Sequence, residues 1–139
     1  MSEGNDPRPA IPPQLFWRML VAGNLTTLVV LLMVAHHAIP LVSMPEAGVW
    51  LFLAGLAAMA PSLLYQRRLT RQMQQRAPDA MSANARAVEQ LKHVVVGLAL
   101  AELPGLFGIA YYLFSHDRAG IALLFVACAA LTWQTKPRD

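Results

Sequence analysis

The sequence predicts an all-α protein with four transmembrane helices, and three observations support this prediction. Of the 139 residues, 56% are hydrophobic and only 14% are charged, whereas about a quarter of the residues in a soluble domain are charged. The apolar residues gather in four stretches separated by polar segments, and the basic residues gather on one side of those stretches. We therefore expect a four-helix bundle built from two antiparallel hairpins, with both termini cytoplasmic.

The apolar stretches set the predicted domain organisation. Residues 1–14 are polar and rich in proline, which predicts a disordered cytoplasmic arm. Residues 15–139 then form a single transmembrane domain. A helix needs about 20 apolar residues to cross the bilayer core, within a range of about 17 to 25. The predicted spans are 18–39, 47–65, 94–114 and 119–135, of which the fourth is the shortest.

The connections between the spans differ in length. A short outer loop around Pro40 joins the first two spans, which predicts an antiparallel hairpin. The cytoplasmic loop 66–93 is long, basic and helical in composition. We expect its first part to extend the second helix, and Asp79 or Ser82 to cap a helix that continues into the third span.

Lysine and arginine residues predict the orientation. Cytoplasmic loops of membrane proteins carry an excess of these residues, and ten of the eleven here fall on one side of the four spans. Only Arg118 lies on the other side. The sequence thus predicts a protein of a bacterial inner membrane with both termini inside. The net charge of +3 is a topological signal and not an indication of nucleic-acid binding.

The basic loop 66–93 has two mutually compatible interpretations. Its charges can form a solvated helical surface. They can also bind anionic lipid headgroups, at about 1 kcal/mol for each basic residue close to the membrane.

One carboxylate lies deep in the third predicted span. Glu102 follows His93 by nine residues, which places it about 13 to 14 Å along the helix, near the middle of a core that is ~30 Å thick. An ionised carboxylate is costly there, so Glu102 must be neutral, paired or facing a hydrated cavity. No basic residue lies at matching depth in the other spans, which leaves neutral partners.

Three side chains and one backbone group are candidate partners for Glu102. Asn24 and Thr27 lie at a similar depth in the first span, and Cys128 lies at a similar depth in the fourth. Pro104 has no amide hydrogen, and its ring clashes with the carbonyl of Leu100, four residues earlier. A protonated Glu102 could donate to that carbonyl, directly or through water.

Small residues at four-residue spacing predict close helix packing in lipid. We expect this packing inside one bundle or, alternatively, in a homo-oligomer. The stripe on the third span comprises Gly97, Ala101 and Gly105, with Gly108 near the same face; the facing surface on the second comprises Ala54, Gly55 and Ala58.

The string A-L-A-E-L-P-G-L-F-G-I resembles the ion-binding helix of rotary ATPase c-subunits. By that resemblance Glu102 matches the ion-binding carboxylate, and Phe107 and Gly108 match an aromatic–glycine pair. The second span has only Gly55 where such rings have a glycine-rich helix, so no ATPase role is inferred. The chain also resembles small bacterial four-helix membrane proteins with an E-x-P-x-x-F-G pattern, which implies an architecture without an activity.

Three functions are compatible with these features. The first is a non-enzymatic structural or accessory membrane subunit, without a cofactor, in which neutral Glu102 bridges helices of one chain or of a larger membrane complex. The alternative is a proton- or cation-handling protein with Glu102 as the protonatable site. The third is a metal or haem site at the outer face, for which the candidate ligands are His36, His37 and His116.

Overall fold

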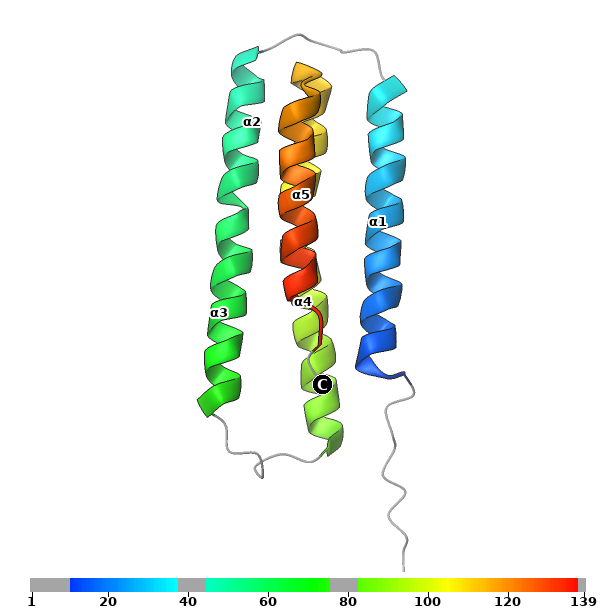
Figure 1. The fold of residues 1–139 in the computed structure, drawn as a ribbon, viewed down its shortest axis with the longest axis vertical. Helices are drawn as coiled ribbons and strands as arrows, with labels where there is room; N and C mark the ends of the chain where they lie inside the picture. The colour runs from blue at the N-terminus through cyan, green and yellow to red at the C-terminus, as the bar shows by residue number, and fades with distance from the viewer. Residues whose placement is uncertain (1–10, 38–44, 76–82, 138–139) are drawn as a thin grey trace, which may run out of the picture.

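The structure, a computed structural model, describes residues 11–37, 45–75 and 83–137 (Figure 1). The proposed caps Asp79 and Ser82 and most of the predicted arm lie outside these residues. The prediction of an all-α fold is confirmed across the described part of the chain. Its helices are α1 (Pro13–His37), α2 (Pro45–Ala57), α3 (Met59–Gln75), α4 (Ala83–Ser115) and α5 (Arg118–Gln134).

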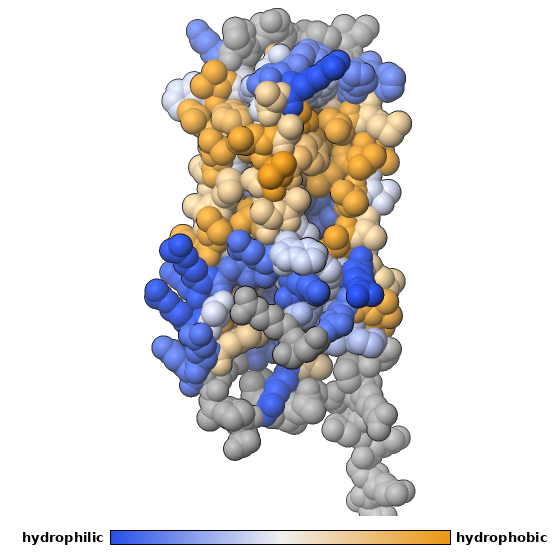
Figure 2. Space-filling model, viewed as in Figure 1, coloured by the Kyte–Doolittle hydropathy of each residue, from blue (hydrophilic) through white to orange (hydrophobic). Residues whose placement is uncertain are grey.

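Three helical segments are long and apolar enough to cross a membrane, judged by length and composition. Figure 2 shows the corresponding surface, where apolar side chains form a broad band with hydrophilic side chains at both ends. The fourth predicted span corresponds to α5, which is apolar but has only 17 residues. The three long segments are Pro13–His37, Glu46–Gln75 and Ala85–Ser115.

The second predicted span is interrupted, and a proline accounts for the position of the break. Helices α2 and α3 follow one another as a single rod that is interrupted at Ala58. Pro61 cannot donate a backbone hydrogen bond, and its ring crowds the carbonyl of Ala57 four residues earlier. Pro104, in contrast, lies within α4 without ending it. The helix is therefore interrupted near Pro61 in the second span and not at Pro104 beside Glu102.

Helix α4 is the centre of the bundle and contacts every other helix. Figure 1 shows α1 on one side and the α2–α3 rod on the other, with α4 and α5 between them. Among the described residues, α1 packs chiefly on α4. The first two spans thus lie on opposite sides of the bundle, and the contacts do not show the packed hairpin expected for them. Helices α4 and α5 do pack as antiparallel neighbours.

The two ends of the bundle are built differently. We call one the basic end, where α1 and α4 begin, α3 and α5 end, and the exposed cations Arg67, Arg68, Arg71 and Lys92 lie. The other is the hairpin end, where α4 turns into α5. At 1.5 Å per residue, α5 is about 26 Å long and α4 about 50 Å. Helix α5 therefore stops well short of the basic end of α4 (Figure 1).

The small residues receive side chains of neighbouring helices. Leu124 of α5 is fully buried, and it lies within 3.1 Å of the Cβ position at both Gly55 and Gly108. At Gly105, the Cβ position lies 3.4 Å from Leu28 of α1 and 3.3 Å from Cys128 of α5. The glycines of the second and third predicted spans thus pack within one bundle, and α5 fills much of the surface between them.

The turn from α4 to α5 consists of His116 and Asp117. His116 has a left-handed backbone (φ 52°) and its N–H donates to the Tyr112 carbonyl, which ends α4 in a compact cap. Asp117 caps α5, since its carboxylate accepts from the backbone N–H groups of Ala119 and Gly120. Because both caps are local, the connection is short and holds the two helices side by side.

Candidate functional site

Glu102 lies in the middle of α4 and is partly buried. It precedes Gly105 by three residues, so it is on the side of α4 that meets α1 and α5. Cys128 of α5, another predicted partner, packs on Gly105, one turn further along α4. Among the described residues, the Glu102 side chain has no hydrogen-bond or ion-pair partner.

Asn24 is half-buried on the face of α1 that packs on α4. A stripe of buried and half-buried side chains runs along α1 and faces α4; it comprises Trp17, Val21, Asn24, Leu28, Leu32 and Ala35. Trp17 packs with Leu98, and Leu28 packs on Gly105. Along α1, Asn24 lies between Trp17 and Leu28. Along α4, Glu102 lies between Leu98 and Gly105. The two polar residues are therefore at the same level of the α1–α4 interface.

The other predicted partners are placed differently. Thr27 is exposed, and its hydroxyl donates to the Gly23 carbonyl within α1 (3.0 Å). Pro104 is fully buried and Leu100 partly buried on α4, which stays helical across both. The proposed contact between Glu102 and the Leu100 carbonyl therefore stays a prediction. Phe107, the aromatic residue of the predicted aromatic–glycine pair, packs against Gly55 of α2.

The histidines of the hairpin end gather around one tyrosine. His36 Nδ1 lies 3.0 Å from the hydroxyl of Tyr112, His37 packs edge-on against His36, and His116 packs edge-on against Tyr112. Within residues 11–37, 45–75 and 83–137, no three His, Cys, Asp or Glu side chains are grouped as metal ligands. The contacts of these rings are aromatic stacking and one hydrogen bond.

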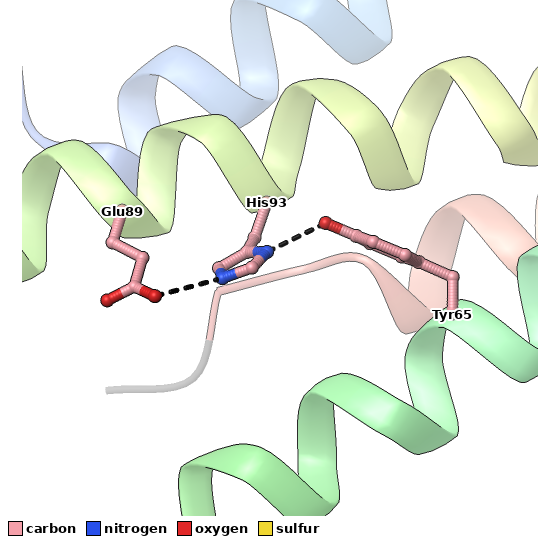
Figure 3. Close-up of polar contacts among 3 residues, drawn as sticks. All are labelled: Tyr65, Glu89 and His93. Carbon is pink, nitrogen blue, oxygen red and sulfur yellow. Dashed lines mark hydrogen bonds and ion pairs between the residues drawn. The ribbon is translucent and has the colours of Figure 1, made fainter. Parts of the chain in front are cut away.

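A polar triad at the basic end was not among the sequence candidates. Figure 3 shows Tyr65 of α3 and Glu89 and His93 of α4 in line. The Tyr65 hydroxyl lies 2.7 Å from His93 Nδ1, and Glu89 Oε1 lies 3.6 Å from Nε2, at ion-pair distance if the imidazole is protonated. Each ring nitrogen of His93 thus has an oxygen atom of a neighbouring side chain close to it. The triad links α3 to α4 just beyond the apolar band.

A recess of about 350 Å³ opens beside this triad. It occupies the space where α5 has ended while α3 and α4 continue. Thr135, which caps the end of α5, is buried against Gly97, and its hydroxyl accepts a hydrogen bond from the Trp17 indole N–H (3.0 Å). The lining residues come from α3 (Gln66, Leu69, Thr70, Met73, Gln74), from α4 (Gln90, His93, Val94), and from the last residue of α5 and the three residues after it (Gln134, Thr135, Lys136, Pro137).

The two polar sites of α4 face in opposite directions. Glu102 and His93 are nine residues apart, which is two and a half turns at 3.6 residues per turn. His93 faces α3, and Glu102 faces the side of α1. The triad is therefore not a continuation of a polar path through Glu102, and the two sites have to be assigned separately.

The triad was not predicted from the sequence, where His93 served only as the point from which the depth of Glu102 was counted. A usable signal was present: Tyr65 ends the second apolar stretch and His93 directly precedes the third, so the two lie at the same depth on neighbouring helices. The recess gave a weaker signal in the shortness of the fourth stretch. Its depth depends on where α5 ends against α4, which composition does not determine.

No family model, curated protein or solved structure matches this chain.

Proposed function

We propose that this protein is a structural or accessory membrane subunit with its basic end in the cytoplasm. In this proposal, neutral Glu102 bridges α1 and α4. The observation that carries the proposal is the common level of Glu102 and Asn24 in the α1–α4 interface. A protonated carboxyl group can donate to the amide oxygen of Asn24, whereas a carboxylate cannot donate. The distribution of Lys and Arg supports the orientation.

The bridge would matter because α1 buries little of its own surface. Only Trp17, Leu28 and Ala35 are buried along its 25 residues. Helices in lipid associate through packing and interhelical hydrogen bonds, because lipid tails are as apolar as the side chains. One polar contact near the middle of α1 would therefore contribute directly to holding it on α4.

A double-mutant cycle tests this bridge. We expect Glu102→Ala and Asn24→Ala to be coupled by about 0.6 to 1.7 kcal/mol, the range for such bonds in membrane proteins. The free energy of unfolding would be measured by sodium dodecyl sulfate titration in mixed micelles. Thr27→Ala is the control partner, because Thr27 is exposed on the same helix. Equal coupling to Thr27 and Asn24, or none to either, would refute the bridge.

Proton or cation handling is the second candidate, favoured by the lack of a described hydrogen bond to Glu102. The variant Glu102→Gln separates the two proposals, since an amide can donate a hydrogen bond but cannot exchange a proton. A bridging role predicts a Glu102→Gln protein as stable as wild type. Proton handling predicts that proton flux into liposomes occurs with wild type and is abolished in this variant.

A further inference from the structure

The recess at the basic end has the chemistry of an anion site. Four glutamines line it, Gln66, Gln74, Gln90 and Gln134, and Lys136 is also among the lining residues. These N–H donors come from three separate segments of the chain. No aspartate or glutamate is among the described lining residues. An anion would therefore meet several donors and a positive charge without a carboxylate to repel it.

Local structure holds Lys136 in place. Its backbone N–H donates to the Trp133 carbonyl (3.2 Å), and its ammonium group lies 5.3 Å from the centroid of the Trp133 indole ring. The neighbouring residue Thr135 is buried and hydrogen-bonded to Trp17. The backbone that carries the cation is thus anchored at the end of α5 beside the recess, and the ammonium group lies over the exposed Trp133 ring.

His93 shapes the wall of the recess instead of acting as a donor to a ligand. Tyr65 engages its Nδ1 atom, and Glu89 lies at ion-pair distance from its Nε2 atom (Figure 3). A ligand would therefore contact the ring and not its nitrogens. The amides and Lys136 remain as the polar groups that can recognise an anion.

The rest of the lining indicates an amphiphile. Leu69, Met73 and Val94 contribute apolar surface to the recess, and Val94 begins the apolar part of α4. The recess thus lies at the boundary of the apolar band, where lipid headgroups lie. Its volume of about 350 Å³ is within the range of small-ligand pockets, about 300 to 1,000 Å³.

We propose that this recess binds the phosphate group of a phospholipid, with the glutamine amides and Lys136 on the phosphate oxygens and the glycerol against the apolar wall. This site is distinct from a general attraction of anionic lipid to the exposed arginines of α3. It is also independent of the bridge between Glu102 and Asn24, which lies on the other face of α4.

Two lysine variants test the site. Native mass spectrometry of the protein in dodecyl maltoside would measure binding of phosphatidylglycerol, with diacylglycerol of the same acyl chains as the lipid without phosphate. Lys136→Gln should weaken phosphatidylglycerol binding about tenfold, the effect of losing one charged hydrogen bond. Lys92→Gln removes the same charge at the same end, but Lys92 is exposed and outside the recess. It should change binding less than about twofold.

A pair of tryptophan variants tests the location independently of charge. Thr70→Trp fills the recess and should abolish lipid binding, whereas Gln72→Trp, on exposed surface of α3 outside the recess, should preserve it. Circular dichroism would show that both variants are folded.

The remaining outcomes decide between sources of the ligand. Displacement of the lipid by glycerol 1-phosphate at equal concentration would support the phosphate site and assign it to soluble phosphate compounds. Equal weakening by Lys136→Gln and Lys92→Gln, or equal binding of diacylglycerol, would overturn the proposal.

Discussion

The two ends of the bundle differ in how completely they are filled. At the hairpin end, α4 passes to α5 through two residues, and the Tyr111 hydroxyl donates to Asp117 Oδ2 at 2.7 Å. At the basic end, α5 stops early and leaves the recess. The comparison shows two consequences of a short helix: its beginning is anchored by local caps, and its early end leaves a recess between its neighbours.

The tight packing of the hairpin end makes Gly120→Ala the most damaging change. A Cβ atom at Gly120 would overlap Tyr111 Cε1 and lie 2.9 Å from Asp117 Oδ2, so these groups would have to move. We expect a loss of about 1 to 3 kcal/mol in the free energy of unfolding, as for other overpacked sites. Detergent titration by circular dichroism would measure it.

Gly23→Ala is the matched control for this prediction. Nothing lies within 4 Å of the Cβ position at Gly23, so alanine should stabilise α1 by roughly 0.5 to 1 kcal/mol. Equal effects of the two substitutions would mean that the hairpin end is not closely packed.

At the basic end, Trp17→Phe should loosen the end of α5 by about 1 kcal/mol. The substitution removes the indole N–H that donates to the buried Thr135 hydroxyl, and a net hydrogen bond is worth about 0.5 to 1.5 kcal/mol. Hydrogen exchange of the last turn of α5 would report the change. Trp50→Phe is the control, since Trp50 is 72% exposed. A similar increase in exchange of the last turn of α5 in this control variant would contradict the proposed anchor.

The smallest expected effect is a pH dependence at the hairpin end. The hydrogen bond from Tyr111, with those from the backbone N–H groups of Ala119 and Gly120, lowers the pKa of Asp117 from its ordinary value. The stabilisation is therefore present above the unfolded pKa of about 3.9 and is lost as the pH falls toward the lower folded pKa. Unfolding titrations between about pH 5 and pH 3 should show a fall in stability that Asp117→Asn reduces. Identical slopes for both proteins would contradict this role.

Much of the helical architecture was predictable from the sequence because apolar stretches and their charged flanks follow directly from the physics of the bilayer. The third predicted span, 94–114, lies within α4, and the first, 18–39, overlaps α1. The extension of the second helix to Gln75 was also expected from its composition. The break at Ala58 was missed, although Pro61 provides its physical reason.

The sites were less predictable because they depend on how helices are oriented around α4. Glu102 was recognisable as one acid in an apolar run, and Asn24 as a polar residue at its depth. Thr27 is exposed, and His93 faces away from Glu102, because of how α1 and α4 are rotated about their axes. The sequence pattern does not determine these rotations, because apolar residues surround both helices. The recess depends on the relative lengths and positions of three helices.

Infrared spectroscopy of Glu102 tests the central claim most directly. Wild-type protein in lipid at neutral pH should show a carboxylic acid C=O stretching band that is absent from Glu102→Gln, and the band should shift in Asn24→Ala but not in Thr27→Ala. Such a result would place a neutral Glu102 in the α1–α4 interface beside Asn24. A difference spectrum with only carboxylate bands, or a band unaffected by Asn24→Ala, would contradict the account.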